Sequence, residues 1–346
     1  IAYNGTKPYM RRNMKITVRS PLAKFISVRL VGNVPSEYPF RVEYDEDYER
    51  VSPGLFPDVL YPIENETVEV LCGPWHSLWI TAAPDGSMPG GNYPIEIVLS
   101  DGELTVSKTM QVEVIDALLP EQEIIFTQWF HADCLADYYQ VPVFSERHWT
   151  LIDQFIKTAA ENGINMMLTP IFTPPLDTQV GHARTQVQLV DIEKQGERYS
   201  FGFDKLRRWI ALCKKNGIKY YEMAHLFTQW GLEFTPNITA MENGASKQIF
   251  GWHVSSDDPE YENFLSQFLP HLTQVLEDEG ISKNTFFHIS DEPHAEHLER
   301  YCRLKEMVKK YLSGYEFIDA LSDYAYYSQG VVDHPIPATN RIQPFI

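Results

Sequence analysis

Short runs in which apolar and polar residues alternate fill the first third of the chain. Such runs are rich in Val, Ile, Thr and aromatic residues and lie between turn-forming residues; examples are 15–19, 26–31, 67–71 and 77–81. Alternation with a period of two indicates strands with one buried face. Several such strands joined by short turns predict an immunoglobulin-like β-sandwich.

The clearest hairpin lies near the end of this region. Residues 95–99 alternate, a turn at Asp101-Gly102 follows, and alternation resumes over 104–106 and 110–115. Glycine in such a turn supplies the positive φ that a tight connection between strands requires. The pattern therefore predicts two adjacent antiparallel strands.

After residue 120 the pattern changes to strands that alternate with helices. Ser145 is a suitable N-cap for a helix over 145–160, and Asn216-Gly217 ends a helix over 203–215. Strands are predicted at 124–129, 164–169, 218–223, 285–289 and 316–321, a sixth begins at 331–332, and further helices cover 260–279 and 294–311.

Alternation of this kind predicts a parallel sheet, because parallel neighbours need a crossover connection. No glycine-rich phosphate turn follows the first strand, so a (β/α)8-type TIM barrel is favoured over a doubly wound open sheet. Leu118-Leu119-Pro120 marks the expected domain boundary, with a sandwich over 1–118 and a barrel over 119–346. Since a barrel closes with eight strands, we expect the barrel to be incomplete. Either the polypeptide continues past residue 346 or the missing strands come from elsewhere.

Charge and cysteine content narrow the class of protein. The chain has 47 acidic and 29 basic residues, a formal charge of -18, which argues against nucleic acids and anionic membranes as partners. The four cysteines are scattered, so they signal neither a zinc site nor a disulfide framework. No run reaches 18 apolar residues and no secretion signal is visible, which favours the cytoplasm, although the sequence begins at Ile1 rather than Met.

The segment 286–294, Phe-Phe-His-Ile-Ser-Asp-Glu-Pro-His, is an apolar run that ends on two adjacent carboxylates and a proline. In a parallel barrel this position, where a strand gives way to a loop, is the catalytic face. When both Asp291 and Glu292 are ionised they repel each other, so one is expected to keep its proton near neutral pH. Such a pair suits glycoside hydrolysis.

Glu292 is the candidate general acid and base, and we expect burial and the neighbouring Asp291 to raise its pKa. The alternative is that both carboxylates only cap the helix that Pro293 opens. A retaining enzyme with a carboxylate nucleophile normally takes its pair from separate strands, about 5 to 5.5 Å apart. Adjacent residues instead suit a substrate whose 2-acetamido oxygen attacks the anomeric carbon.

Three motifs in this order resemble glycoside hydrolase family 123, the β-N-acetylgalactosaminidases. They are Ser-Asp-Glu-Pro at 290–293, His-Leu-Phe-Thr-Gln-Trp-Gly at 225–231 and Ile-Phe-Gly-Trp at 249–252. The resemblance implies substrate-assisted, retaining release of terminal β-linked N-acetylgalactosamine, without a metal or organic cofactor. It also implies that Asp291 orients the amide and that Glu292 is the acid and base. The expected partner is a glycolipid or glycan with this terminal sugar; the preference for galacto over gluco configuration rests on the resemblance alone.

Other residues at strand ends are candidates for sugar contacts. They are Trp129 and His131 after the first strand, His225 and Trp230 after the third, His288 within the fourth, and Tyr324 after the fifth. Each has an alternative interpretation: Trp129 as core packing, Trp230 as loop packing and His288 as a hydrogen-bonding group inside the barrel.

His294 and His297 lie near the carboxylates, but they lack the His-Glu-x-x-His spacing of zinc peptidases, so no metal site is expected. Two alternatives remain open. A non-catalytic protein could bind amino sugars without cleaving them. A glycosidase acting on sugars without an acetamido group would need a second carboxylate at a later strand end, such as Asp323.

Overall fold

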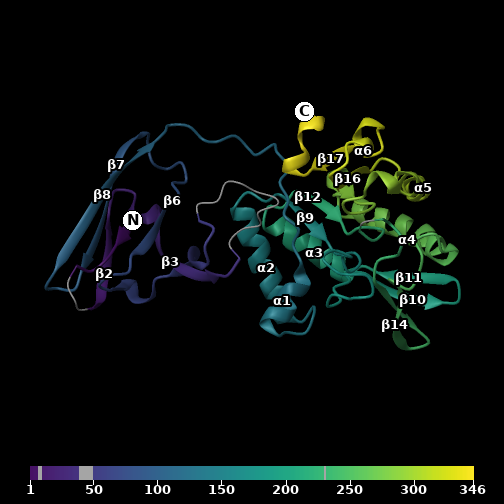
Figure 1. Cartoon of the computed structure of the whole chain (residues 1–346), viewed down its shortest axis with the longest axis horizontal. Coiled ribbons are helices and arrows are strands. Elements are labelled where there is room, and N and C mark those ends of the chain that lie inside the picture. Colours follow the sequence, from purple (N-terminus) through teal and green to yellow (C-terminus); the bar gives the residue numbers. More distant parts are fainter. Residues whose placement is uncertain (7–9, 39–49, 230) are drawn as a thin grey trace. The chain divides into compact units, whose positions relative to one another are not determined.

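The computed structural model describes residues 1–6, 10–38, 50–229 and 231–346, and it is a mixed α/β structure (Figure 1). It divides into two compact units, Ile1–Glu121 and Gln122–Ile346. Each unit has its own hydrophobic core, so each is described by itself. None of the helices in the described ranges is long and apolar enough to span a membrane.

The first unit consists of two four-stranded antiparallel sheets, ordered β1-β6-β3-β4 and β5-β2-β7-β8. Both sheets contribute side chains to one hydrophobic cluster, including Met14, Leu78 and Ile97. The strands are β1 (Ala2–Tyr3), β2 (Arg11–Arg19), β3 (Ile26–Ser36), β4 (Gly54–Pro62), β5 (Thr67–Val70), β6 (His76–Ala82), β7 (Gly91–Ser100) and β8 (Thr105–Val114).

The predicted hairpin is confirmed as β7 and β8, which pair along their whole lengths from Gly91↔Val114 to Ser100↔Thr105. Gly102 has a φ of +92°, as the turn requires. The Asp101 carboxylate accepts hydrogen bonds from the backbone N–H groups of Glu103 (3.0 Å) and Leu104 (2.8 Å), which holds the connection in place.

The second unit contains a parallel sheet in the order β17-β16-β15-β12-β9. A parallel bridge between Thr127 and Met166 adds the preceding segment at its β9 edge. The parallel strands therefore lie in the sheet in the same order as in the chain, without a reversal of that order. The strands are β9 (Met166–Thr169), β12 (Tyr220–Met223), β15 (Thr285–Phe287), β16 (Glu316–Leu321) and β17 (His334–Pro337).

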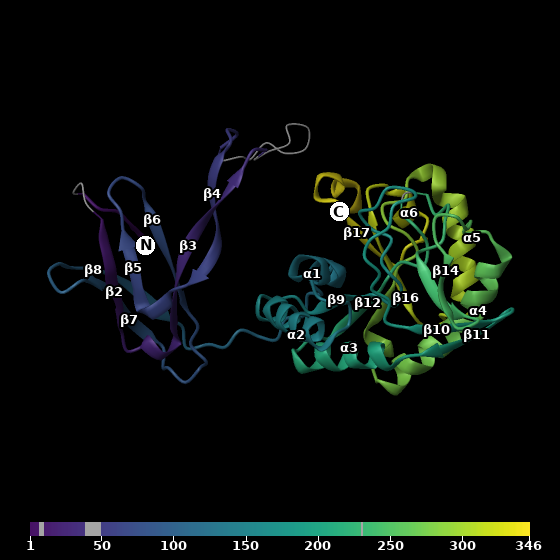
Figure 2. The ribbon, with the colours of Figure 1, turned by 90° about the horizontal axis from the view of Figure 1, so that it is seen from below.

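Helices connect successive parallel strands, and α3, α4 and α5 lie on the outside of the sheet (Figure 2). Their apolar faces join the strands in one core, in which Trp209 of α3 is fully buried. The helices are α1 (Ala132–Tyr139), α2 (Glu146–Glu161), α3 (Asp204–Lys215), α4 (Pro259–Asp278), α5 (Leu298–Lys309) and α6 (Ala325–Ser328).

Several predicted boundaries are wrong. The strand expected at 124–129 is only the bridge at Thr127, because the side chain of Asn165 takes the hydrogen bonds of Phe126 N–H and Ile124 C=O. The strand expected over 285–289 ends at Phe287, so His288 lies just beyond it. The helix expected from His294 begins as a short 3-10 turn, Ala295–His297, before α5, and helix α1 was not predicted.

The two long loops of the predicted barrel contain a second, four-stranded sheet in the order β11-β10-β13-β14. One hairpin follows β9 and the other follows β12, and they join through a parallel pairing of β10 with β13. The Asn243-Gly244 turn has positive φ at both residues, the geometry of a two-residue hairpin. The strands are β10 (Asp191–Gln195), β11 (Arg198–Gly202), β13 (Ile238–Glu242) and β14 (Ala245–Phe250).

We expect Ser145→Ala to lower the free energy of unfolding of the second unit by about 1 kcal/mol. The Ser145 hydroxyl accepts a hydrogen bond from the His148 N–H (3.3 Å) at the start of α2. Ser145→Asn keeps an acceptor and is the matched control, with an expected loss below about 0.5 kcal/mol. Urea unfolding measures both, and a stable alanine variant would contradict the capping role.

Candidate active site

The segment that follows β15 is held against the segment that follows β12. The N–H of Leu226 donates to His288 C=O (3.2 Å), and the N–H of Phe227 donates to Ile289 C=O (3.1 Å). The buried Ser290 hydroxyl donates to the carbonyl of Thr228 (3.0 Å). These bonds prolong the parallel ladder beyond the named strands and fix the approach to Asp291.

Asp291 and Glu292 lie in different environments although they are adjacent. Asp291 is 9% exposed, whereas Glu292 is exposed. Glu292 has a φ of +43°, which is rare for a residue with a side chain. Pro293 is buried. The turn at Glu292 therefore separates one carboxyl group that faces the protein from one that is open to solvent.

Burial raises the pKa of Asp291 to about 7, and the negative charges of Glu292 and Asp319 add to the effect. The positive charge of His288 opposes it. The expectation from sequence placed burial and the raised pKa at Glu292; in the structure both are found at Asp291. The reason is that the Asp291 side chain is buried whereas that of Glu292 is exposed.

A fully buried network lies beside this segment and joins three strands. His288 contacts a carboxylate with each ring nitrogen: Nε2 lies 2.9 Å from Glu222 of β12, and Nδ1 lies 3.1 Å from Asp319 of β16. Since carboxylates only accept, both nitrogens must donate, which makes the ring an imidazolium. The two carboxylates raise the pKa of His288 to about 9 even though burial opposes this.

The remaining contacts of the two carboxylates also come from donors. Glu222 accepts from the hydroxyl of Thr127 and from the indole N–H of Trp129 (3.2 Å). Asp319 accepts from the hydroxyl of Tyr301 and from the backbone N–H of Ile289. Each carboxylate thus has three donors, as an ionised buried carboxylate requires.

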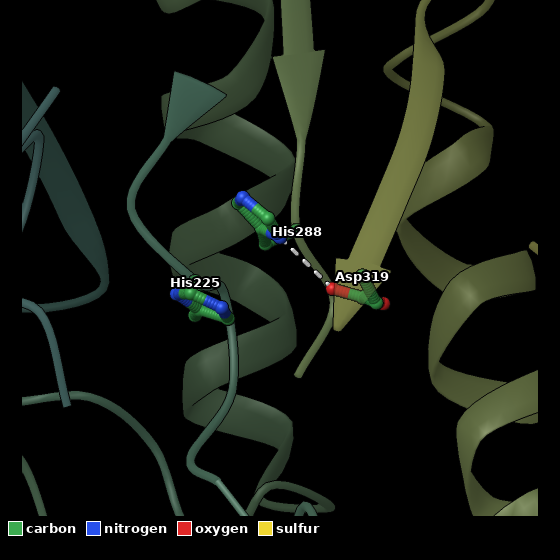
Figure 3. Close-up of side chains that lie close together, drawn as sticks. All are labelled: His225, His288 and Asp319. Atoms are coloured by element: carbon green, nitrogen blue, oxygen red, sulfur yellow. Dashed lines mark hydrogen bonds and ion pairs between the residues drawn. The ribbon is translucent and has the colours of Figure 1, made fainter. Parts of the chain in front are cut away.

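The ring of His225 stacks on that of His288, with centroids 4.2 Å apart and planes inclined by 18° (Figure 3). Burial and the positive charge of His288 hold the pKa of His225 well below its usual value. Neither nitrogen of His225 has a hydrogen-bond partner among the described residues. Trp129 packs edge-on against both rings, at 5.3 Å and 6.0 Å.

His225, His288 and Asp319 place ligand-type atoms within 4.8 Å of one another, which invites comparison with a metal centre. An imidazole directs its lone pair in the plane of its ring, and two stacked rings cannot both point at one ion between them. Both nitrogens of His288 also donate to carboxylates. The geometry fits a hydrogen-bonded network better than a metal site.

The loop after β9 brings a further charged group close to the carboxyl pair. The negative charge of Asp177 contributes to the raised pKa of Asp291. The side-chain oxygen of Gln229 accepts from Asp177 N–H (3.2 Å), and the amide of Gln229 donates to Thr178 C=O (2.8 Å), so this loop is tied to the one after β12. His131 Nε2 lies 3.8 Å from Asp177.

His131 is mostly buried and is adjacent to a fixed cation. Burial lowers its pKa, and the positive charge of Arg184 lowers it further. Arg184 is held by two hydrogen bonds to Asp133 (2.8 and 3.3 Å). The Nδ1 atom of His131 has no partner among the described residues.

Of the predicted residues, His288 acts directly on Asp291 through its charge. Trp129 and His225 contact His288, and His131 lies close to Asp177, which also acts on Asp291. Tyr324 is different: it is 39% exposed, and its ring contacts are Tyr327 and Phe345. Trp230 lies outside the described residues. Sequence reasoning missed Glu222, Asp319 and Asp177; the first two carried a readable signal, an acid between apolar residues of a predicted strand.

Comparisons with known proteins were made for the whole chain. The family model of the glycoside hydrolase 123 catalytic domain matches residues 129–346. No curated protein matches the chain.

A solved family 123 glycoside hydrolase from Clostridium perfringens, described in terms of glycolipid glycan hydrolysis, aligns with a TM-score of 0.73 and 16% identity. The alignment covers 99% of this chain and 61% of that one, so this chain spans about three fifths of its length. At this identity the similarity shows the fold alone. β-Glucuronidases from Parabacteroides merdae (9% identity, covering 95% of this chain and 35% of that one) and Bacteroides uniformis (10%, 97% and 35%) align with TM-scores of 0.32 and 0.31, too low to support an argument.

We expect Asp291→Asn to stabilise the folded protein at pH 8 but not at pH 4. A carboxyl group whose folded pKa is raised from 3.8 to about 7 stabilises the fold below pH 3.8, and this contribution is lost as the pH rises through about 7. The upper limit of the gain above pH 7 is about 4 kcal/mol, from about 1.4 kcal/mol per pKa unit. Unfolding across this pH range measures it; a gain independent of pH would contradict the assignment.

Proposed function

The chain belongs to glycoside hydrolase family 123, and we propose that it releases terminal β-linked N-acetylgalactosamine from a glycan with retention of configuration. The observation that carries this proposal is the carboxyl pair after β15, in which Asp291 is buried with a raised pKa and Glu292 is exposed. The solved relative is described as acting on glycolipid glycans, which makes a glycolipid the first substrate to test.

The proposed reaction has two displacements at the anomeric carbon. Glu292 donates its proton to the glycosidic oxygen while the carbonyl oxygen of the 2-acetamido group attacks the anomeric carbon. The leaving group departs as an alcohol, and the sugar becomes a cyclic oxazolinium cation. Glu292 then takes a proton from water, which attacks the anomeric carbon and reopens the ring with overall retention.

Asp291 is the group that orients the acetamide in this scheme. Its carboxylate accepts a hydrogen bond from the amide N–H, which makes the carbonyl oxygen more nucleophilic. Positive charge that develops on the oxazolinium favours the ionised form of Asp291. A carboxyl group with a pKa near 7 in the free protein can therefore lose its proton when the substrate reacts.

Two of the residues predicted to contact the sugar have ring nitrogens without a hydrogen-bond partner, which supports that role. Both nitrogens of His225 and Nδ1 of His131 are buried without a partner in the described part of the chain, so sugar hydroxyl groups would satisfy them. Trp129 and His288 already bond to Glu222, so we assign them the role of positioning residues. Trp230 and Tyr324 remain proposed contacts on the basis of sequence.

The finer fold assignment is also a proposal. We propose that the two antiparallel sheets of the first unit form a β-sandwich, since both contribute to one core. We propose that the parallel strands of the second unit are part of a (β/α) barrel, since their order follows the chain without the reversal of a doubly wound sheet. The expected domains, 1–118 and 119–346, are proposed on this basis.

Glu292→Gln should reduce hydrolysis of N-acetylgalactosaminides with poor leaving groups by about 10² to 10⁴. An activated aryl leaving group needs less protonation, so the loss with that substrate should be smaller. Glu296→Gln, at an exposed carboxylate nearby, is the matched control. The acid assignment fails if the variant retains the wild-type rate on the poor leaving group.

Asp291→Asn should lose about 10² or more in kcat/KM on the same substrates while its melting temperature does not fall. The asparagine side chain cannot supply the negative charge that the oxazolinium requires. Binding of a thiazoline analogue of the cyclised intermediate, measured by calorimetry, should weaken in parallel. Full activity of this variant would contradict amide assistance, and a wild-type protein that binds the sugar without turnover would indicate a carbohydrate-binding protein.

A further inference from the structure

A buried network close to the carboxyl pair contains two carboxyl groups and one imidazolium. Glu222 and Asp319 share His288, and each also bonds to a hydroxyl group and to an N–H group, so the network carries a net negative charge when both acids are ionised. Burial raises the pKa of Asp319, and its hydrogen bonds with His288 and Tyr301 oppose this effect. All three side chains are fully buried. A net charge in such a place is costly unless it serves an interaction.

The charge of this network reaches Asp291. Asp319 accepts a hydrogen bond from the N–H of Ile289, two residues before Asp291. Its negative charge acts on the Asp291 carboxyl group, and the positive charge of His288 acts in the opposite sense. The network is therefore electrically coupled to the place where the sugar is proposed to react.

We propose that Glu222, His288 and Asp319 form a preorganised anionic floor that stabilises positive charge on the bound sugar, so that the site prefers cationic sugars to neutral ones. This inference rests on the proposed function, since the oxazolinium is the cation that the floor would stabilise. Fixed charges of this kind need not reorganise when the reaction occurs, which makes them effective in a buried site. The three residues act through position and charge rather than by touching the reacting atoms.

The test compares two probes of similar shape. One is N-acetylgalactosamine, and the other is its iminosugar analogue, in which a protonated ring nitrogen replaces the ring oxygen. Calorimetry at a pH where the iminosugar is protonated gives the ratio of the two affinities. We expect wild-type protein to bind the cationic probe about tenfold or more tightly than the neutral one.

Asp319→Asn and Glu222→Gln each remove one negative charge and leave an acceptor for His288. Both variants should lose about tenfold in affinity for the cation and less than about threefold for the neutral sugar. Tyr301→Phe is the matched control, because it removes a hydrogen bond to Asp319 without changing a charge, so the ratio should persist.

A second readout is the pKa of Asp291, followed in the pH dependence of kcat/KM. Removal of the Asp319 charge should move the ascending limb of the profile to lower pH, since that charge raises the pKa of Asp291. A purely structural role would not produce this shift. The charges of Glu292 and Asp177, which also act on Asp291, are unchanged in this variant, whereas His288 loses one of the two carboxylates that raise its pKa.

Equal losses for both probes would overturn the inference, as would an unchanged ratio in both variants. If neither variant folds, wild-type protein decides, because equal affinity for the two probes would also overturn it. Wild-type protein that binds neither probe would overturn the proposed substrate class and this inference together. Binding of both probes without a preference would overturn the inference alone.

Discussion

The imidazolium of His288 holds the centre of the second unit together. It lies just beyond β15 and donates to Glu222 of β12 and Asp319 of β16, so three neighbouring strands are joined at the same depth by charged hydrogen bonds. Removing one partner of a buried ion pair typically lowers the free energy of unfolding by about 3 to 5 kcal/mol. The position of Asp291, three residues further along the same segment, depends on this arrangement.

The two carboxyl groups of the pair differ in burial. Adjacent side chains on an extended segment point to opposite faces, and here Asp291 is buried while Glu292 is exposed at a residue with a left-handed backbone. Burial and nearby negative charges raise the pKa of Asp291, whereas Glu292 is exposed to solvent. The proposed substrate-assisted reaction takes both of its carboxyl groups from this one segment.

The sequence predicted those features that depend on local patterns. The β7–β8 hairpin follows from alternation, and the capped helix α2 follows from a serine N-cap. The carboxyl pair could be found because it interrupts an apolar run. The sequence could not predict which of the two carboxyl groups is buried, because burial and the left-handed backbone at Glu292 both depend on tertiary contacts.

Other features depend on pairings between distant segments. The bonds of Asn165 to residues 124 and 126 replace an expected strand, and no local pattern reveals them. Glu222 and Asp319 are 97 residues apart, the difference of their numbers, yet they share one histidine. By contrast, the Asn243-Gly244 turn was a readable hairpin signal inside what was interpreted as a loop.

The hairpins that follow β9 and β12 form one shared sheet, which limits the insertions and deletions that this region can accept. Its two hairpins meet through the pairing of β10 with β13, so each covers an edge of the other. Loss of one hairpin would leave the other with an unpaired strand edge, which could pair with a strand of another chain. Insertions and deletions here should therefore be tolerated, in evolution or in engineering, when both excursions change together.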